Sequence, residues 1–165
     1  MKLLFVCLGN ICRSPILEAV ARERFARAGV DWQVASCGTG GWHAGDGADA
    51  RAVQAGHARG YALHTHRARQ LRASDYTEFD FLLAADESNL RDLRTRAPAQ
   101  SERLVLTLPF SGIDTPREVP DPYYGGARDF QHVVDLAERI ADGLLLRLGS
   151  GHTVLGARAS RPRGT

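Results

Sequence analysis

Continuous apolar runs recur along the chain, and each is short enough to be a β-strand. The first run, KLLFVC, occupies residues 2–7 and has the composition of a strand that is buried on both faces. Similar runs follow at residues 32–36, 79–85 and 103–108. The pattern therefore predicts four buried strands.

In most of the intervals between these strands, apolar residues recur at the spacing of a helix. Such spacing runs from Ile16 to Ala28, and Gly29 ends the predicted helix. Ser14 and Pro15 mark its start, because serine caps free amides and proline suits the first helical position. Further helices are predicted at residues 48–59, 87–96 and 129–148.

Strands that alternate with helices favour parallel pairing through right-handed crossovers. The predicted fold class is therefore α/β, with three layers (α/β/α) around a central four-stranded parallel sheet. Ligands of such sheets bind at the carboxyl ends of the strands. Cys7 ends the first strand and Asp86 follows the third, so chemistry is expected near these residues. The long irregular segment at residues 111–128 is also expected to be functional.

The size and composition indicate one globular domain. The chain has 165 residues and a mass of 18.0 kDa, with 44% hydrophobic and 24% charged residues. These values argue against wholesale disorder. The domain is expected to span residues 1–148. Residues 149–165 are expected to form a basic, flexible tail that contains Arg158, Arg161 and Arg163.

Charge and hydropathy argue against two kinds of partner. The net charge of +2 is too small to predict binding to nucleic acid. No apolar run approaches the roughly 18 residues of a membrane span, so no membrane partner is expected. The N-terminal apolar run lacks a small-residue cleavage site and does not fit a signal peptide. We therefore expect a cytoplasmic protein, with export in the absence of a signal peptide left open.

The cysteines support the same compartment. Cys7, Cys12 and Cys37 are an odd number, which argues against a secreted disulfide framework. Their spacing matches no zinc site, so no metal is expected. In a reducing compartment such cysteines are core residues or reactive thiols.

The segment CLGNICRSP at residues 7–15 carries the candidate chemistry. It joins a predicted strand to a predicted helix, whose first amides are unpaired and carry partial positive charge. A loop that wraps over this helix end adds further amides and forms a site for an anion. Gly9 permits the tight curve, and Asn10 tolerates the left-handed backbone that such a curve requires.

Cys7 and Arg13 make this loop a candidate catalytic site. Arg13 presents a planar fork that can bind two oxygens of a phosphate. Cys7 would lie at the bottom of the ring of amides, where its thiolate is stabilised and faces the phosphorus atom as a nucleophile. The alternative is a buried strand cysteine beside an ordinary turn, but every residue of the loop fits the anion site.

The loop resembles the active-site loop of the low-molecular-weight protein tyrosine phosphatases. FDFLLAADESNLRDL at residues 79–93 and VPDPYYGG at residues 119–126 also resemble family segments, so the likeness extends over residues 3–148. The resemblance, closer to bacterial members, implies a phosphatase-I-like fold with four parallel strands. It also implies metal-independent hydrolysis of protein phosphotyrosine through a phosphocysteine intermediate, with no cofactor.

The resemblance implies roles for four catalytic side chains. Cys7 matches the nucleophile, Arg13 the residue that holds the phosphoryl oxygens, and Ser14 the hydroxyl that hydrogen-bonds the thiolate. Asp121 matches the general acid that protonates the leaving phenolate and then serves as base for water; taken alone, it would be a turn residue. The phosphate-binding residues would be Leu8, Gly9, Asn10, Ile11, Cys12 and Arg13.

Further matches concern support of the loop and recognition of the substrate. Asn10, Ser36 and His66 match a polar network that stiffens the loop, although His66 taken alone would be a surface histidine. The aromatic residues Tyr123 and Tyr124 match a pair beside the substrate ring.

Trp42 falls where the family has a variable aromatic residue on the opposite wall of the pocket. A partly buried anchor for the surrounding loop is an equally good interpretation of this side chain. Leu8 and Ile11 are expected to line the floor and rim of the pocket.

The remaining two cysteines and the DESN segment have alternative interpretations. Cys12 matches the second cysteine of the family loop and could form a disulfide with Cys7 under peroxide, or it could be a small core residue. Cys37 stands where the family commonly has alanine and is interpreted as a packing substitution. Asp86 and Asn89 either order the loops through hydrogen bonds or belong to a helix cap.

Other function classes stay open. Arginine-phosphate phosphatases of the same fold have a similar loop but carry threonine in place of Ile11, and a hydroxyl there suits a guanidinium. Arsenate reductases of this fold need further cysteines, and none follows Cys37. A binding module would not need Asp121. The expected partners are tyrosine-phosphorylated proteins, with phosphate or another oxyanion in the loop, and the chain is expected to be a monomer or weak dimer.

Overall fold

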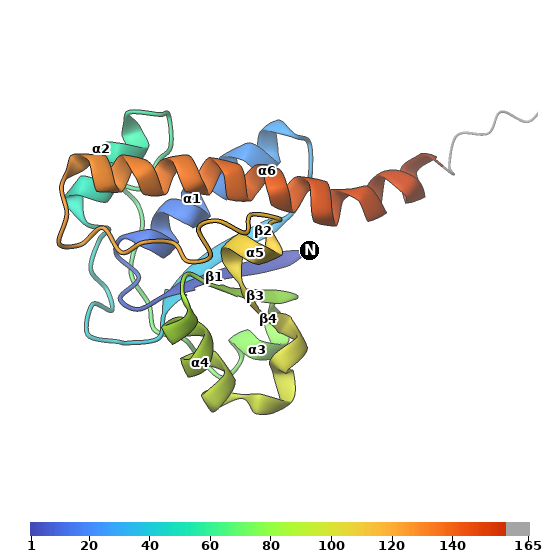
Figure 1. Ribbon diagram of the computed structural model, residues 1–165, viewed down its shortest axis with the longest axis horizontal. Coiled ribbons are helices and arrows are strands. Elements are labelled where there is room, and N and C mark those ends of the chain that lie inside the picture. The colour runs from blue at the N-terminus through green and yellow to red at the C-terminus, as the bar shows by residue number, and fades with distance from the viewer. Residues whose placement is uncertain (158–165) are drawn as a thin grey trace, which may run out of the picture.

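A four-stranded sheet forms the centre of the molecule in a computed structural model that describes residues 1–157 (Figure 1). Its strands run parallel and lie in the order β2-β1-β3-β4. Their bounds are β1 (Lys2–Cys7), β2 (Gln33–Gly38), β3 (Phe81–Ala84) and β4 (Leu104–Leu106).

The sheet order changes direction between β1 and β3. From β1 the chain moves to β2 on one side and then returns to β3 on the other side. In open parallel sheets this point leaves a crevice beyond the carboxyl ends of the two strands. Cys7 and Asp86 therefore come to the same edge of the sheet, as the sequence pattern predicts.

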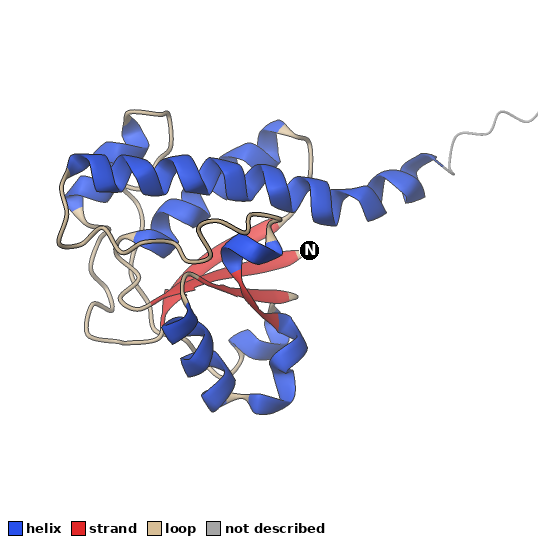
Figure 2. Ribbon diagram, in the orientation of Figure 1, coloured by secondary structure: helices blue, strands red, loops and turns tan. Residues whose placement is uncertain are grey.

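Helices cover both faces of the sheet (Figure 2). Leu3 and Phe5 of β1 pack into the core formed with α1 (Arg13–Arg27) and α6 (Ala127–Ala157). Leu4 and Val6 point to the opposite core, because successive strand residues face opposite sides. The remaining helices are α2 (Ala50–His57), α3 (Asp75–Glu78), α4 (Glu87–Arg96), the 3-10 helix η1 (Pro98–Arg103) and α5 (Thr107–Phe110).

These layers confirm the predicted α/β/α class and its four-stranded parallel sheet. The periodicity did not predict α3, η1 and α5, which have only four to six residues. Such lengths give at most two helical turns, too few for an apolar period to be distinguished from a loop.

The predicted role of Ser14 as a helix cap is wrong. Helix α1 begins at Arg13, and Cys12 occupies the position before it without capping through its side chain. The hydroxyl of Ser14 lies instead within hydrogen-bond distance of the Cys7 sulfur. Ser14 is therefore free to contribute to the site at the end of β1.

The last helix is longer than its apolar period predicts. Helix α6 runs from Ala127 to Ala157, nine residues beyond the predicted end at Leu148. The division into a domain at residues 1–148 and a tail at 149–165 stays a prediction, and its three arginines lie outside the described residues. Between residues 1 and 157, no helix is long and apolar enough to span a bilayer.

Candidate active site

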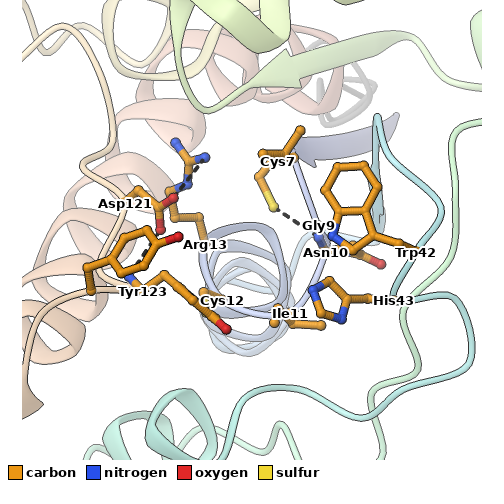
Figure 3. A pocket seen from close by; sticks show the side chains of 12 residues that line it. Cys7, Gly9, Asn10, Ile11, Cys12, Arg13, Trp42, His43, Asp121 and Tyr123 are labelled. Atoms are coloured by element: carbon orange, nitrogen blue, oxygen red, sulfur yellow. Dashed lines mark hydrogen bonds and ion pairs between the residues drawn. The ribbon is translucent and has the colours of Figure 1, made fainter.

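A pocket of about 290 Å³ opens at the carboxyl ends of β1 and β3. The segment between β1 and α1 forms its floor, and loops that follow β2 and precede α6 form its walls (Figure 3). It brings together nearly all of the predicted catalytic and binding residues. Its lining residues are Cys7, Leu8, Gly9, Asn10, Ile11, Cys12, Arg13, Trp42, His43, Asp121, Tyr123 and Tyr124.

The loop after β1 curves around the Cys7 sulfur. Asn10 has a φ of 58°, in the left-handed region that few residues other than glycine adopt. This conformation allows the backbone amide of Asn10 to point back at Cys7 Sγ, 3.3 Å away. Ser14 Oγ lies 3.0 Å from the same sulfur. The backbone amide of Asn10 and the hydroxyl of Ser14 thus converge on the sulfur of Cys7.

The side chain of Asn10 joins the loop to three other parts of the chain. Its Nδ2 donates to Ser14 Oγ at 2.8 Å and to Ser36 Oγ at 3.0 Å, and its Oδ1 accepts from the amide of Arg69 at 3.0 Å. His66 Nε2 lies 2.8 Å from the backbone oxygen of Asn10. The structure therefore places Ser36 and His66 against the loop.

Glu18 sets the direction of the hydrogen bonds in this network. Ser36 donates its proton to Glu18 Oε1 at 2.8 Å, because a carboxylate can only accept. Ser36 can then only accept from Asn10, and Asn10 likewise donates to Ser14. Ser14 can therefore donate its proton to Cys7 Sγ at 3.0 Å, and the oxygen of Cys37, at 3.5 Å, is the more distant acceptor. Sequence reasoning missed Glu18, since nothing in its helical position distinguishes it from a surface residue.

Arg13 is held rigidly beside the loop. The residue is only 4% exposed, and its Nη1 donates to Asp86 Oδ2 at 2.7 Å and to the oxygen of Val119 at 3.2 Å. Burial acts to lower the pKa of Arg13, but the negative charges of Cys7 and Asp86 outweigh it and raise the pKa above its usual value. Arg13 thus stays cationic at the mouth of the loop.

Asp86 combines both of the functions that the sequence left open. It is the N-cap of α4, where its Oδ1 accepts from the amide of Asn89 at 2.8 Å. Its other oxygen forms the ion pair with Arg13. Because α4 follows β3 directly, the cap fixes the carboxylate at the switch point of the sheet.

Asp121 lies beside Arg13 at one side of the pocket (Figure 3). Its Oδ2 lies 4.0 Å from Arg13 Nη2, and its side chain is 49% exposed. Its Oδ1 accepts from the amide of Tyr123 at 3.1 Å, which forms a tight turn around Pro122. The predicted acid is therefore close to the predicted phosphate clamp and remains in contact with solvent.

Aromatic residues form two opposite sides of the rim. Tyr123 and Tyr124 pack edge to face with their ring centroids 5.0 Å apart, and Tyr124 is 95% exposed. On the other side Trp42 lines the pocket and is 65% exposed. Its indole lies against Gly40, where a Cβ would come within 1.9 Å of the ring. Trp42 thus lines the pocket and also packs on its own loop, so both interpretations of this side chain stay open.

His43 is a pocket residue that sequence reasoning did not assign. Its ring lies over Gly9, with Cδ2 3.1 Å from where a Cβ would project. Nδ1 lies 3.3 Å from Asp46 Oδ2. The only signal was its position directly after Trp42, which is too weak to separate a pocket residue from a solvated loop.

The other cysteines differ from Cys7 in their surroundings. Burial raises the pKa of Cys12 to about 12, and the charges of Asp49, Cys7 and Asp121 contribute to this rise. Cys12 is therefore a neutral thiol near pH 7, which is a poor nucleophile. Cys37 is completely buried in the core, and burial raises the pKa of its thiol further.

No group of three or more His, Cys, Asp or Glu side chains in residues 1–157 has the arrangement to hold a metal ion.

Substitutions of Asn10 should distinguish how much its backbone conformation and its side-chain hydrogen bonds each contribute to the stability of the fold. Asn10→Gly keeps the left-handed conformation but leaves buried partners such as the Arg69 amide without a bond, which should lower the free energy of unfolding by about 1–3 kcal/mol. Asn10→Ala should cost about 1–2 kcal/mol more, because alanine is strained at this φ. Urea denaturation measures both. Equal stability of the two variants would contradict the backbone argument.

Comparisons with known proteins place the chain in a family. A family model described as low molecular weight phosphotyrosine protein phosphatase matches residues 2–153. A low molecular weight protein-tyrosine-phosphatase of Streptomyces coelicolor is 43% identical over 152 residues, which cover 87% of this chain and 91% of the relative.

Solved structures extend the comparison to three dimensions. The structure of a protein tyrosine phosphatase from Entamoeba histolytica superimposes with a TM-score of 0.86 at 38% identity, covering 92% of this chain and 99% of the other. A Drosophila arginine phosphatase superimposes with a TM-score of 0.82 at 29% identity, covering 90% and 98%. The family match over residues 2–153 includes every part of the pocket, and the chain belongs to the low molecular weight protein-tyrosine-phosphatase family.

Proposed function

We propose that this enzyme hydrolyses phosphotyrosine in proteins through a covalent phosphocysteine on Cys7. The observation that carries the proposal is the convergence at one pocket of a nucleophile, a cation and an acid. Cys7 Sγ lies 3.0 Å from the Ser14 hydroxyl, and the Arg13 guanidinium reaches to within 4.0 Å of Asp121. A site that only binds phosphate would need no acid beside the clamp.

The phosphate of the substrate occupies the loop, where backbone amides of residues 8–13 surround it. Asp86 and the Val119 carbonyl occupy Nη1 of Arg13, which leaves Nη2 and Nε to bind two phosphate oxygens. Since the guanidinium is already fixed, little conformational entropy is lost when the substrate binds.

The first step transfers the phosphoryl group to the enzyme. Cys7 Sγ attacks phosphorus, an S–P bond forms, and the bond from phosphorus to the tyrosine oxygen breaks. Asp121 gives its proton to that oxygen, because a phenolate leaves slowly unless it is protonated. Arg13 and the loop amides stabilise the charge on the oxygens that do not react.

The second step returns the enzyme to its starting state. Asp121, now a carboxylate, takes a proton from a water molecule that attacks phosphorus. The S–P bond breaks, its electrons return to Cys7, and inorganic phosphate leaves. The hydroxyl of Ser14 stabilises the departing thiolate through the network that ends at Glu18.

The rim supports an aromatic substrate. Tyr123, Tyr124 and Trp42 provide apolar surface on two sides of the pocket, and Ile11 offers an alkyl group where a guanidinium would need a polar partner. Phosphoarginine is the second candidate, because one structural neighbour is an arginine phosphatase. Arsenate reduction, and binding of phosphate without catalysis, are less well supported than hydrolysis of phosphotyrosine or phosphoarginine.

Several expectations from the sequence remain part of the proposal. We infer a cytoplasmic enzyme that acts as a monomer or weak dimer, without cofactor or metal. Cys12 would protect Cys7 under peroxide by forming a disulfide with it, which releases water from oxidised Cys7. Its raised pKa makes Cys12 the slower partner in this reaction.

The substrate class and the nucleophile can be tested together. Matched peptides that bear phosphotyrosine, phosphoserine or phosphoarginine are incubated in chelator, and phosphate release is measured. The enzyme should prefer phosphotyrosine, and Cys7→Ser should reduce turnover by about 10³-fold or more. Circular dichroism checks that the variant is folded. Turnover by Cys7→Ser at the parent rate would overturn the nucleophile, and a preference for phosphoarginine would overturn the substrate class.

The acid role of Asp121 predicts a dependence on the leaving group. Asp121→Asn removes the proton donor, so kcat/KM should fall by about 10²-fold or more for phenyl phosphate. It should fall much less for an aryl phosphate with a nitro-substituted leaving group, which needs little protonation. Initial rates with a series of aryl phosphates measure how strongly the loss of kcat/KM depends on the leaving group. The same loss on every substrate would show that Asp121 does not donate the proton.

A further inference from the structure

Arg51 links the start of α2 to the loop that carries Asp121. Its Nε and Nη2 bind the two carboxylate oxygens of Asp49, each at 3.0 Å, as a planar fork. Asp49 is also the N-cap of α2 and accepts from the Arg51 amide at 2.9 Å. The guanidinium is therefore fixed to its own helix start, which leaves Nη1 to reach elsewhere.

The free side of Arg51 contacts the segment after Asp121. Nη1 donates to the backbone oxygen of Gly125 at 3.2 Å. The guanidinium carbon lies 5.6 Å from the ring centroid of Tyr123 and 4.6 Å from that of Phe130. These distances are within the range of cation–π attraction, which favours arginine over lysine.

Asp49 connects the same assembly to the phosphate-binding loop. Its backbone amide donates to the oxygen of Ile11 at 2.9 Å. The hydrogen bond with Arg51 lowers the pKa of Asp49, so the carboxylate stays ionised and paired near neutral pH. A continuous path of bonds thus runs from Ile11 through Asp49 and Arg51 to Gly125.

The other end of the Asp121 loop is anchored separately. The amide of Val119 donates to the oxygen of Ala85 at 2.9 Å, and its oxygen accepts from Arg13. Asp121 lies between these anchors, and 49% of its side chain is exposed. Its carboxylate accepts a local hydrogen bond from the amide of Tyr123 and otherwise has, among the residues that the structure describes, only the 4.0 Å ion pair with Arg13. Its position over the pocket therefore depends on both ends of the loop.

We propose that Arg51 is a positioning residue that holds the Asp121 loop over the phosphate-binding loop for proton transfer to the leaving group. This inference rests on the proposed function, in which Asp121 is the acid. Arg51 itself does not need to touch the substrate. It sets the distance between the carboxyl group of Asp121 and the oxygen that receives the proton. Proton transfer is sensitive to this distance.

Arg59 provides a matched control. It follows α2, and its side chain is 39% exposed, as is that of Arg51. It also pairs with two carboxylates, those of Asp135 and Glu138 on α6, but it does not line the pocket. Arg59→Met therefore removes a similar ion pair from the same region without touching the Asp121 loop.

The test compares kcat/KM for phenyl phosphate and for a nitrophenyl phosphate in chelator. Arg51→Met should lose about tenfold on phenyl phosphate and less than about twofold on the better leaving group. Arg51→Lys, which keeps the charge but not the fork, should fall between the parent and Arg51→Met. Arg59→Met should keep the ratio of the two substrates found in the parent. Urea denaturation of each variant reports its stability.

A double variant separates positioning from general damage. In an Asp121→Asn background, Arg51→Met should cost less than about twofold on either substrate, because the group it positions is gone. Equal losses on both substrates, or a full tenfold loss in that background, would overturn the proposal. If Arg51→Met does not fold, the same comparisons with Arg51→Lys decide the question.

Failure of the proposed function would have a different signature. It would show in the parent enzyme, as turnover that survives Cys7→Ser or does not depend on Asp121 and the leaving group. A parent that passes those tests, with Arg51→Met behaving as Arg59→Met does, would remove only the role of Arg51.

Discussion

The left-handed backbone of Asn10 is the constraint on which the phosphate-binding loop depends. A residue with a side chain is strained there by about 1–2 kcal/mol, and its buried side-chain hydrogen bonds offset that strain at about 1 kcal/mol each. Its partners belong to α1, β2 and the segment around Arg69, which are far apart in the chain. The loop therefore acquires its shape only when these elements have assembled, and it then presents its amides to an anion without further rearrangement.

Asp121, the proposed acid, is held near the loop by a second set of contacts. Asp86 fixes Arg13 because it caps α4 at the end of β3, and Arg13 in turn holds the carbonyl of Val119. The far side of the Asp121 loop is attached through Arg51 to the start of α2. The switch point between β1 and β3 thus brings Cys7 and Arg13, from one loop, together with Asp121 from a distant segment, as the proposed nucleophile, cation and acid. An acid beside the phosphate site is of use in cleaving a phosphate ester, whereas a site that only binds phosphate would not need one.

Much of this could be predicted from the sequence, since the features concerned are local. The apolar runs define the four strands, and the spacing from Cys7 to Arg13 defines an anion loop between a strand and a helix. The resemblance to the family then pointed to Asp121 in its proline-flanked segment, and the structure places it beside Arg13. The short helices α3, η1 and α5 could not be predicted, because they are held by tertiary packing rather than by an apolar period.

The residues that sequence reasoning missed act through contacts that no local pattern encodes. Glu18 sits one helical turn beyond Ser14 and resembles any surface glutamate until Ser36 is brought beside it. Arg51 is one of twenty arginines, and only the folded chain shows that its fork spans Asp49 and Gly125. Ser14 was expected as a cap, but α1 begins at Arg13, so Ser14 lies in the first turn of the helix with its hydroxyl beside Cys7, where the family resemblance placed it.

The central claim is that phosphate becomes covalently attached to Cys7 during turnover, and trapping that species tests it most directly. The enzyme is mixed rapidly with a nitrophenyl phosphate, quenched, digested and mapped by mass spectrometry. A phosphorylated peptide that contains Cys7 should form in the parent and be absent from Cys7→Ser. Turnover at a normal rate with no phosphate on any peptide would contradict the central claim, because water would then attack the substrate directly.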